Sequence, residues 1–257
     1  MLDLHSIYKT FNAGTVNEKT ALNGLNLHLN EGDFVTVIGG NGAGKSTMLN
    51  AVAGTWFVDE GKITIDDIDV TKLPEHKRAK YLGRVFQDPM TGTAATMQIE
   101  ENMALAARRG MTRSLKAGIT AKEREFYREQ LKILGLGLED RLTSKVGLLS
   151  GGQRQALTLL MATLKKPRLL LLDEHTAALD PKTADIIMEL TGKIVAEKHL
   201  TTIMVTHNLR FAVEYGNRLL MMHQGHAVMD KKGEEKANTK VDDILDMFNA
   251  SSIECGN

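Results

Sequence analysis

Stretches of alternating or continuous apolar residues run through the first third of the chain and predict β-strands. Residues 2–11 (LDLHSIYKTF) and 21–29 (ALNGLNLHL) alternate between apolar and polar positions, which is typical of a strand with one buried face. Residues 33–40 (DFVTVIGG) form a β-branched apolar run that ends in glycine, as a buried strand does. Residues 61–70 (GKITIDDIDV) and 83–88 (GRVFQD) predict two further strands, the first of them with a turn.

Helical spacing replaces this pattern at several places farther along. Residues 45–54 (KSTMLNAVAG) predict a helix that Gly54 closes. From about residue 88 to residue 166 β-branched runs are scarce, and residues 99–110 (IEENMALAARRG) and 120–134 (TAKEREFYREQLKIL) place apolar side chains at helical intervals. This change predicts a helical subdomain inserted into a β-rich core.

Strands and helices alternate in the last third of the chain. Predicted strands occupy residues 168–174 (RLLLLDE) and 201–208 (TTIMVTHN), and a strand pair is expected over residues 217–230 (NRLLMMHQGHAVMD). A long helix is predicted for residues 181–199, and a short amphipathic helix for residues 241–248. Such alternation is typical of a sheet whose strands are joined by helices.

The order of the elements predicts an α/β fold with a largely parallel central sheet and an N-terminal antiparallel β part. We interpret the 257 residues as one domain, whose core comprises residues 1–87 and 167–230. Residues 88–166 would form the helical subdomain, and residues 231–257 a polar tail with a short helix. Ligands of such sheets bind beyond the carboxyl ends of the strands, so the chemistry is expected there.

Composition narrows the classes of partner. Lys and Arg together number 32, as do Asp and Glu, so no global positive field favours nucleic acid. The single cysteine, Cys255, cannot form an internal disulfide, which suggests a cytosolic chain with one bystander thiol. No apolar run approaches the roughly 20 residues of a membrane-spanning helix, and the N-terminus lacks the apolar core of a signal peptide. Work at a membrane would therefore require a partner.

Residues 39–47 (GGNGAGKST) match the phosphate-loop pattern G-x-x-x-x-G-K-S, between a predicted buried strand and a predicted helix. Glycines let successive N–H groups point inward around an anion, and the helix adds its positive end. Lys45 would reach the β- and γ-phosphates, and Ser46 would bind Mg²⁺. The alternative is a glycine-rich turn with an exposed lysine. The nucleotide-binding residues expected here are Gly39, Asn41, Gly42, Ala43, Gly44, Lys45, Ser46 and Thr47.

A second strand delivers two acids at its carboxyl end. Asp173 would hold Mg²⁺, and Glu174 would act as the general base toward the attacking water. Ordinary surface acids at a strand end are the alternative, which the nearby phosphate loop disfavours.

Two further strand ends carry candidate catalytic residues. His207 could contact a γ-phosphate and the water, although a histidine beside a helix capped by Asn208 is common. Gln87 could serve as a metal ligand and water contact, or could be an ordinary loop residue.

Residues 149–155 (LSGGQRQ) combine a helix start with two glycines. Ser150 and Gln153 have the spacing of a capping box. Gly151 and Gly152 each cost a helix about 1 kcal/mol relative to alanine, so a close approach to the bare backbone is expected. A helix start of this kind binds anions. The chain thus has two predicted phosphate-binding helix starts, which two copies facing head to tail could bring to one nucleotide.

The motifs GGNGAGKST, VFQDP, LSGGQRQ, LLLLDE, AALD and VTHN, in that order, resemble those of ABC transporter nucleotide-binding subunits over about residues 1–230. The resemblance implies a P-loop NTPase core and two ATP molecules held between two subunits. It assigns Ser150, Gly151, Gly152 and Gln153 to the γ-phosphate of the partner's ATP, and Asp180 to the dimer interface. Asp180 precedes Pro181, so capping the next helix is a competing role. Phe11 aligns with the family's adenine-stacking aromatic, and a strand core residue is the alternative.

Many members of the family have proline where this chain has His175, which affects loop geometry but removes no catalytic group. The resemblance is to a bacterial branch of importers, which implies an ATPase at the cytoplasmic face of the membrane. A permease and an extracytoplasmic binding protein would be its partners, and an aromatic or other amino acid its solute. The alternatives are an ABC ATPase outside transport, which one nucleotide domain without a basic arm disfavours, and a GTP switch, which would need an N-K-x-D motif.

Overall fold

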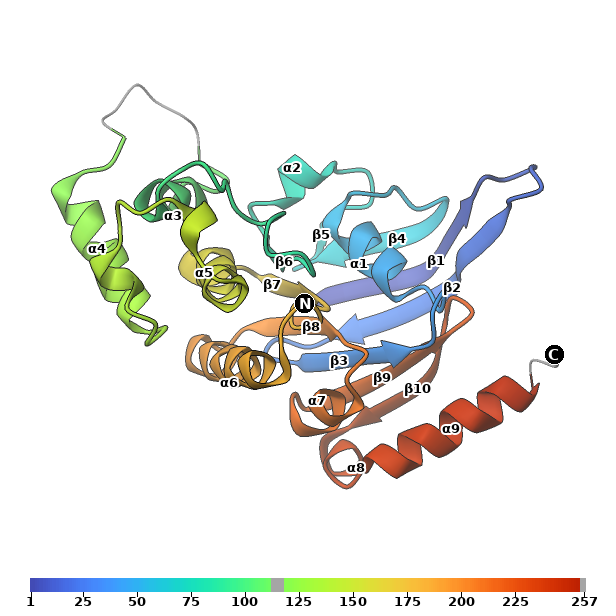
Figure 1. Cartoon of the computed structure of the whole chain (residues 1–257). Helices are drawn as coiled ribbons and strands as arrows, with labels where there is room; N and C mark the ends of the chain where they lie inside the picture. Colours follow the sequence, from blue (N-terminus) through green and yellow to red (C-terminus); the bar gives the residue numbers. More distant parts are fainter. Residues whose placement is uncertain (112–117, 255–257) are drawn as a thin grey trace. The chain divides into compact units, whose positions relative to one another are not determined.

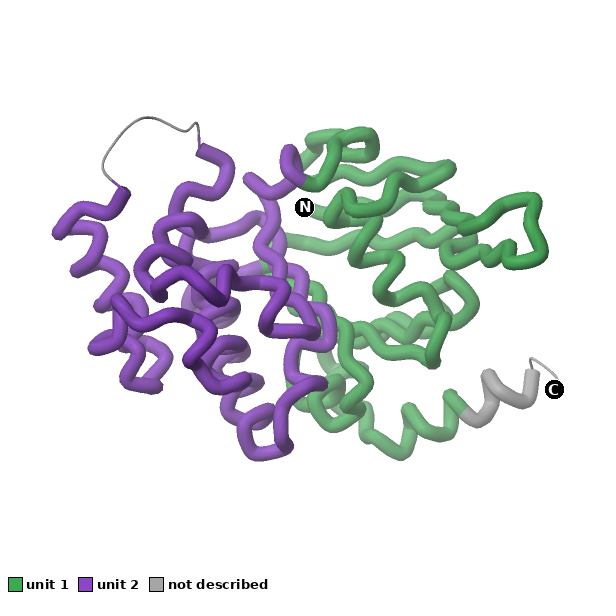
Figure 2. The backbone as a smooth tube through the Cα atoms, turned by 45° about the horizontal axis from the view of Figure 1, so that its top comes forward, with its two compact units in different colours: residues 1–75, 201–257 green, residues 76–200 purple. Residues whose placement is uncertain are grey.

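The structure is a computed structural model that describes residues 1–111 and 118–254 (Figure 1). The chain divides into two compact units (Figure 2). The first unit comprises Met1–Glu75 and Thr201–Asn257, and the second comprises His76–Leu200. The α/β fold class is confirmed, whereas the predicted bounds of the core and of the helical subdomain stay a prediction. Cys255 lies outside the described residues.

An antiparallel sheet forms the first part of the first unit, as the alternating pattern predicts. Its strand order is β2-β1-β4-β5, with every neighbouring pair antiparallel. Asp66 and Asp67, both with positive φ, make the turn that joins its last two strands. The strands are β1 (Leu2–Phe11), β2 (Lys19–Leu29), β4 (Glu60–Ile65) and β5 (Ile68–Asp69).

A second group of strands in the first unit has the order β10-β9-β3-β8. β3 runs parallel to both of its neighbours and is buried throughout, which explains its continuous apolar run. β9 and β10 form the predicted strand pair, which runs antiparallel. The strands are β3 (Phe34–Gly39), β8 (Thr201–Val205), β9 (Arg218–His223) and β10 (His226–Lys232).

Helices of the first unit pack on these strands. Gly54 closes α1 in a left-handed conformation, as predicted. The C-terminal helix α9 is longer than the predicted residues 241–248, and its Ile244 is buried with Ile38 of β3 and Met221 of β9. The helices are α1 (Lys45–Ala53), α7 (Leu209–Glu214), α8 (Gly233–Ala237) and α9 (Val241–Glu254).

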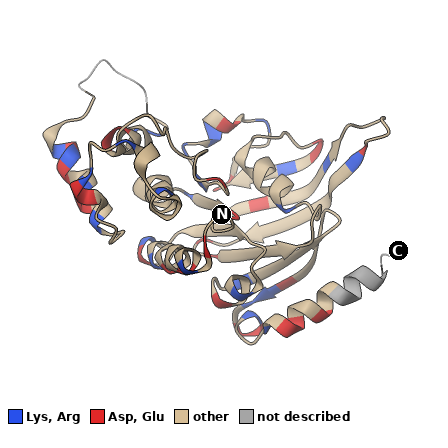
Figure 3. Cartoon of the chain, in the orientation of Figure 1, with Lys and Arg blue, Asp and Glu red and all other residues tan. Residues whose placement is uncertain are grey.

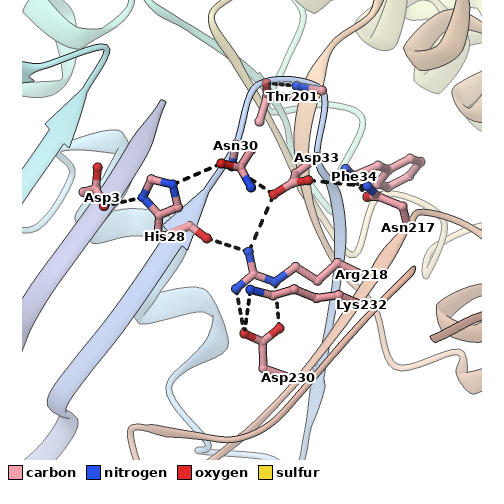
Figure 4. Close-up of polar contacts among 11 residues, drawn as sticks. Asp3, His28, Asn30, Asp33, Phe34, Thr201, Asn217, Arg218, Asp230 and Lys232 are labelled. Carbon is pink, nitrogen blue, oxygen red and sulfur yellow. Dashed lines mark hydrogen bonds and ion pairs between the residues drawn. The ribbon is translucent and has the colours of Figure 1, made fainter. Parts of the chain in front are cut away.

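One buried cation joins the two sheets of the first unit (Figure 4). The Arg218 side chain is 4% exposed and donates to both carboxylate oxygens of Asp230 at 2.7 Å. It also donates to the His28 carbonyl oxygen of β2 at 2.5 Å and lies 3.6 Å from Asp33. Because a buried guanidinium needs such partners, this network fixes β2 against β9 and β10.

The second unit contains two parallel strands and most of the helices. α4 carries side chains of both charges along its length, as a solvated helix does (Figure 3). α2 (Glu75–Arg78) lies where the chain passes from the first unit to the second. The strands and the other α-helices described in this unit are β6 (Leu82–Val85), β7 (Leu169–Asp173), α3 (Ile99–Ala107), α4 (Ala121–Lys132), α5 (Gly151–Leu164) and α6 (Pro181–Lys198).

An ion pair ties α3 to α4 within the second unit. Arg124 donates to the two carboxylate oxygens of Glu100 at 2.6 and 2.9 Å. The hydrogen bond from Arg124 lowers the pKa of Glu100, whose side chain is 5% exposed. Thr120 and Glu123 form a capping box that starts α4. These polar contacts set the position of two helices that the apolar pattern alone would leave free to slide.

Candidate functional site

The loop over residues 39–47 connects β3 directly to α1. Gly44 caps the helix with φ of 100°, and a side chain there would strike a neighbouring backbone carbonyl, so glycine is required. Lys45 is 5% exposed, and its Nζ donates to the carbonyl oxygens of Gly39 at 2.8 Å and Gly40 at 3.0 Å. An ammonium group and a helix N-terminus thus lie at one loop, an arrangement that suits a phosphate.

His207 lies at the same sheet edge as this loop. Val37 of β3 is in parallel register with Val205 of β8, and Thr206 N donates to the Val37 carbonyl oxygen at 3.1 Å. The loop and His207 each follow two residues after these paired valines. The first unit therefore brings together the phosphate loop and an exposed His207, while Asn208 caps α7 as predicted.

Phe11 is partly buried at the end of β1. Its ring meets Trp56 edge to face, with centroids 5.4 Å apart. Lys19 pairs with Phe11 in the sheet, and its Nζ lies 3.2 Å from the position that a Cβ on Gly42 would take. The aromatic pair therefore sits at the end of a hairpin that reaches the phosphate loop. Trp56 was missed because nothing in its surrounding sequence indicates a strand or a motif.

A small cavity opens beside the phosphate loop. Its volume is about 170 Å³, and residues 40–43 line it together with His223, Gln224 and Phe248. Phe248 belongs to α9, so the C-terminal helix reaches the loop. The sequence predicted a short amphipathic helix over residues 241–248 but gave no sign that it meets this loop.

The second unit places Gln87 and Glu174 at one sheet edge. Val85 of β6 is in parallel register with Leu172 of β7, and each candidate follows two residues later. Asp173 is the last residue of β7. Gln87, Asp173 and Glu174 thus lie at the carboxyl ends of two neighbouring parallel strands, which meet at one edge of the sheet.

Arg84 is a charged neighbour that sequence analysis did not identify. Its guanidinium lies 3.7 Å from the carboxylate of Asp173 and 4.5 Å from the ring centroid of Phe86. Both side chains of the pair are mostly buried. In the sequence, Arg84 stands out only as a charged residue within an apolar run. A strand at the edge of a sheet also tolerates such a residue, so this position alone does not indicate a site.

His175, which stands where many members of the resembled family have proline, is a buried imidazole. His175 is 2% exposed, and burial lowers its pKa to about 4, so the ring is neutral at pH 7. Its Nε2 lies 3.1 Å from Thr191 Oγ1 of α6. The Gln155 amide of α5 donates to the His175 carbonyl oxygen at 2.6 Å. The preceding residue, Glu174, has φ of 46°, a backbone conformation that residues other than glycine rarely adopt.

The LSGGQ segment starts α5 with the predicted capping box. Ser150 Oγ accepts from Gln153 N, and Gln153 Oε1 accepts from Ser150 N, both at 3.2 Å. The two glycines differ: a Cβ on Gly152 would collide with Thr183 Cγ2, whereas a Cβ on Gly151 would meet only Leu179 Cδ2 at 3.5 Å. Packing therefore explains Gly152 but does not explain Gly151.

Asp180 caps α6, the competing role that its position before Pro181 predicts. Its Oδ1 accepts from Thr183 N at 3.1 Å, and hydrogen bonds from Thr183 lower the pKa of this exposed carboxyl. Its place at a dimer interface stays a prediction.

The residues that the sequence predicts as Mg²⁺ ligands all offer oxygen atoms. In the first unit, Ser46 is an exposed hydroxyl at the start of α1, and in the second unit Asp173 and Gln87 offer a carboxylate and an amide oxygen. Mg²⁺ prefers such ligands and usually binds one or two carboxylates together with phosphate and water. Within residues 1–111 and 118–254, no cluster of three or more His, Cys, Asp or Glu side chains forms a complete metal cage. Each of the three residues thus offers the kind of oxygen ligand that Mg²⁺ takes when it binds with a nucleotide.

The described part of the chain contains no helix long and apolar enough to cross a membrane.

Comparison with known proteins identifies the family of this site. Residues 22–177, which contain the phosphate loop, LSGGQ and both strand-end acids, match the ABC transporter family model. The chain is 45% identical to the Tyrosine transport ATP-binding protein of Clostridioides difficile (strain R20291), over 96% of this chain and 98% of that protein. It is 33% identical to the Methionine import ATP-binding protein MetN 2 of Enterococcus faecalis (strain ATCC 700802 / V583), over 90% of this chain and 65% of that protein.

Solved structures agree with this grouping. A dimeric ATP-binding cassette in a post-hydrolysis state, bound to ADP and phosphate, is 32% identical in sequence and has a TM-score of 0.76. The match covers 90% of this chain and 98% of the cassette. The chain therefore belongs to the ABC transporter family, as one of its nucleotide-binding subunits, and hydrolyses ATP.

Proposed function

We propose that this chain is the ATPase subunit of a bacterial importer for an aromatic amino acid, with tyrosine as the first candidate. The observation that carries the proposal is the 45% identity to a tyrosine transport subunit over nearly the whole of both proteins. The methionine import subunit is more distant, and this chain spans only 65% of it. The ATPase would act on the cytoplasmic face of the membrane, bound to a permease that receives solute from an extracytoplasmic binding protein.

Two copies of the chain would enclose two ATP molecules. Each ATP would lie on the phosphate loop of one copy and on the LSGGQ helix start of the other. The two helix starts, α1 and α5, support this arrangement because each offers a positive helix terminus to an anion. The likeness to a dimeric cassette also supports it. Phe11 would stack on adenine and Asp180 would lie at the interface.

Hydrolysis would proceed by in-line attack of water on the γ-phosphorus. Glu174 takes a proton from the water, the new P–O bond forms, and the bond to the β,γ-bridging oxygen breaks to give ADP and phosphate. Lys45 stabilises the charge that develops on the phosphate oxygens. His207 and Gln87 orient the water and the γ-phosphate. Ser46, Asp173 and Gln87 would hold Mg²⁺, which when bound neutralises phosphate charge.

The first test concerns the ATP chemistry. Glu174→Gln should bind ATP and accumulate as a dimer, measured by size-exclusion chromatography with light scattering, because the closed state cannot hydrolyse its nucleotide. Glu189→Gln, an exposed acid on α6, is the control and should behave as the parent. A Glu174→Gln protein that hydrolyses ATP at the parent rate would refute the general-base assignment.

The second test concerns transport. Native membranes are solubilised gently, the tagged subunit is purified, and its partners are identified by mass spectrometry. We expect a multi-span permease and a binding protein. Deleting the gene should then abolish uptake of labelled tyrosine and leave methionine uptake intact. A wholly soluble partner set would favour an ATPase outside transport, and loss of methionine uptake alone would replace the proposed solute.

A further inference from the structure

Three segments of the second unit meet at one buried side chain, Gln155. This residue lies in α5, two positions after the last residue of LSGGQ, and is 0% exposed. Its Nε2 donates to the carbonyl oxygen of Phe86 at 3.1 Å and to that of His175 at 2.6 Å. Phe86 immediately precedes Gln87, and His175 immediately follows Glu174. One amide group thus joins the LSGGQ helix to both strand-end loops.

This contact requires a side chain that donates two hydrogen bonds. Both partners are carbonyl oxygens, which only accept, so the NH₂ end of the amide must face them. A carboxylate at this position would meet two acceptors and repel them. Among the described residues the Gln155 Oε1 atom is buried and has no hydrogen-bond partner. The side chain therefore leaves its own acceptor unsatisfied while its two hydrogens serve the loops.

The loop after β7 is also held from its other side. Thr191 Oγ1 on α6 donates to the Ile187 carbonyl oxygen at 2.7 Å, so its hydrogen is already used. The 3.1 Å contact with His175 therefore runs from the imidazole Nε2–H to the Thr191 oxygen. Gln155 holds the backbone of His175, and Thr191 holds its ring.

Both contacts hold His175, the residue that follows one in an unfavourable backbone conformation. Glu174 has φ of 46°, in the left-handed region of backbone conformation that residues other than Gly, Asn and Asp seldom occupy. Such conformations persist where the surroundings determine them. The direction of the Glu174 carboxylate consequently depends on how its neighbour is held.

We propose that Gln155, together with the pair His175 and Thr191, is a positioning residue for ATP hydrolysis. It couples the LSGGQ helix to the loops of Gln87 and Glu174, so that the general base is aligned only when the helix is seated. The inference rests on the role of Glu174 proposed above. It predicts a defect in the hydrolytic step and leaves ATP binding on the phosphate loop intact.

The main experiment compares steady-state kinetics of Gln155→Leu with the parent. Leucine fills the buried site with an apolar side chain of similar volume and removes both donors. A shift of the base by about 1 Å can cost about a hundredfold in rate, so we expect kcat to fall tenfold to a hundredfold. The KM for ATP and the affinity for a fluorescent ATP analogue should stay within about twofold of the parent. Thr163→Val, which removes another buried hydrogen bond of α5, is the control and should keep the parent kcat.

Variants of the contact between His175 and Thr191 provide a second test in case Gln155→Leu does not fold. Thr191→Val and His175→Leu should each lower kcat, whereas His175→Gln should restore much of it, because its amide places an N–H donor near the position of Nε2. In the Glu174→Gln background, Gln155→Leu should have no further effect on residual hydrolysis, because the group it positions is gone. A purely structural role would lower rates and binding together in every background.

The outcomes separate the two proposals. If Glu174→Gln hydrolyses ATP at the parent rate, the general-base role fails and this inference fails with it. If Glu174→Gln is inactive but Gln155→Leu and Thr191→Val keep kcat within about twofold of the parent, the positioning role alone is overturned. Loss of ATP affinity in proportion to kcat would also overturn it.

Discussion

The two glycines of LSGGQ are required for different reasons: Gly152 by packing, and Gly151, as we propose, by the approach of a phosphate. The substitution Gly151→Ala tests the second reason. Gly151 is exposed, has an ordinary φ, and a Cβ on it would meet only Leu179 at 3.5 Å, a normal van der Waals distance. Alanine is favoured over glycine by about 1 kcal/mol in a helix interior, and we expect a smaller gain at the first residue of α5. The substitution should therefore stabilise the fold by about 0.5 kcal/mol, which raises Tm by about 1–2 °C in a chain of this size.

The same methyl group should harm hydrolysis. In the proposed dimer, the γ-phosphate of the ATP on the other copy's phosphate loop approaches the bare backbone of Gly151. The Cβ of an alanine there would displace this phosphate by about 1 Å, which can lower kcat by up to about a hundredfold. ATP binding to the isolated subunit, which uses the phosphate loop, should not change. Gly152→Ala behaves differently, because its Cβ would collide with Thr183, and we expect a loss of about 1–3 kcal/mol in stability from overpacking.

Three measurements on the purified Gly151→Ala protein test these expectations. They are Tm by calorimetry, affinity for a fluorescent ATP analogue, and the steady-state rate of ATP hydrolysis. Gly118→Ala is the matched control, since Gly118 also has an ordinary φ and open space around it. A stable Gly151→Ala protein that hydrolyses ATP at the parent rate would show that nothing approaches this backbone, and the head-to-tail dimer would lose its main argument.

Further predictions concern charges elsewhere in the chain. Lys45→Met should lower ATP affinity at least about tenfold in equilibrium binding, because the ammonium at the loop is lost, and unchanged affinity would contradict its phosphate role. Asp230→Asn should lower the free energy of unfolding in urea by about 1–3 kcal/mol, since the buried Arg218 loses a charged partner, and a change below about 0.5 kcal/mol would argue against that network. Glu100 has a pKa lowered by the hydrogen bond from Arg124, so its contribution is present above the unfolded pKa of about 4.3 and lost as pH falls below it. Between about pH 5 and pH 3 the parent should therefore lose more free energy of unfolding in urea than the Glu100→Gln variant. An equal loss in the two proteins would contradict this.

The sequence alone predicted the local architecture well, because the features involved depend on neighbouring residues. The capping box of Ser150 and Gln153, the glycine stop at Gly54 and the cap at Asp180 all appear as predicted. Each follows from the chemistry of a few consecutive backbone groups. The parallel strand ends of Gln87 and Glu174 were also expected, since the apolar runs before them indicate buried strands.

The sequence also determined the family and the ATP chemistry, since a phosphate loop, two strand-end acids and LSGGQ in fixed order carry that information whatever their surroundings. What only the tertiary structure decided depends on residues far apart in the chain. Thr183 makes Gly152 a packing requirement, and the carbonyls of Phe86 and His175 give Gln155 its role. The apolar pattern shows which face of an element is buried, but not which atoms meet it there. That is settled only when long-range packing brings the separate segments together.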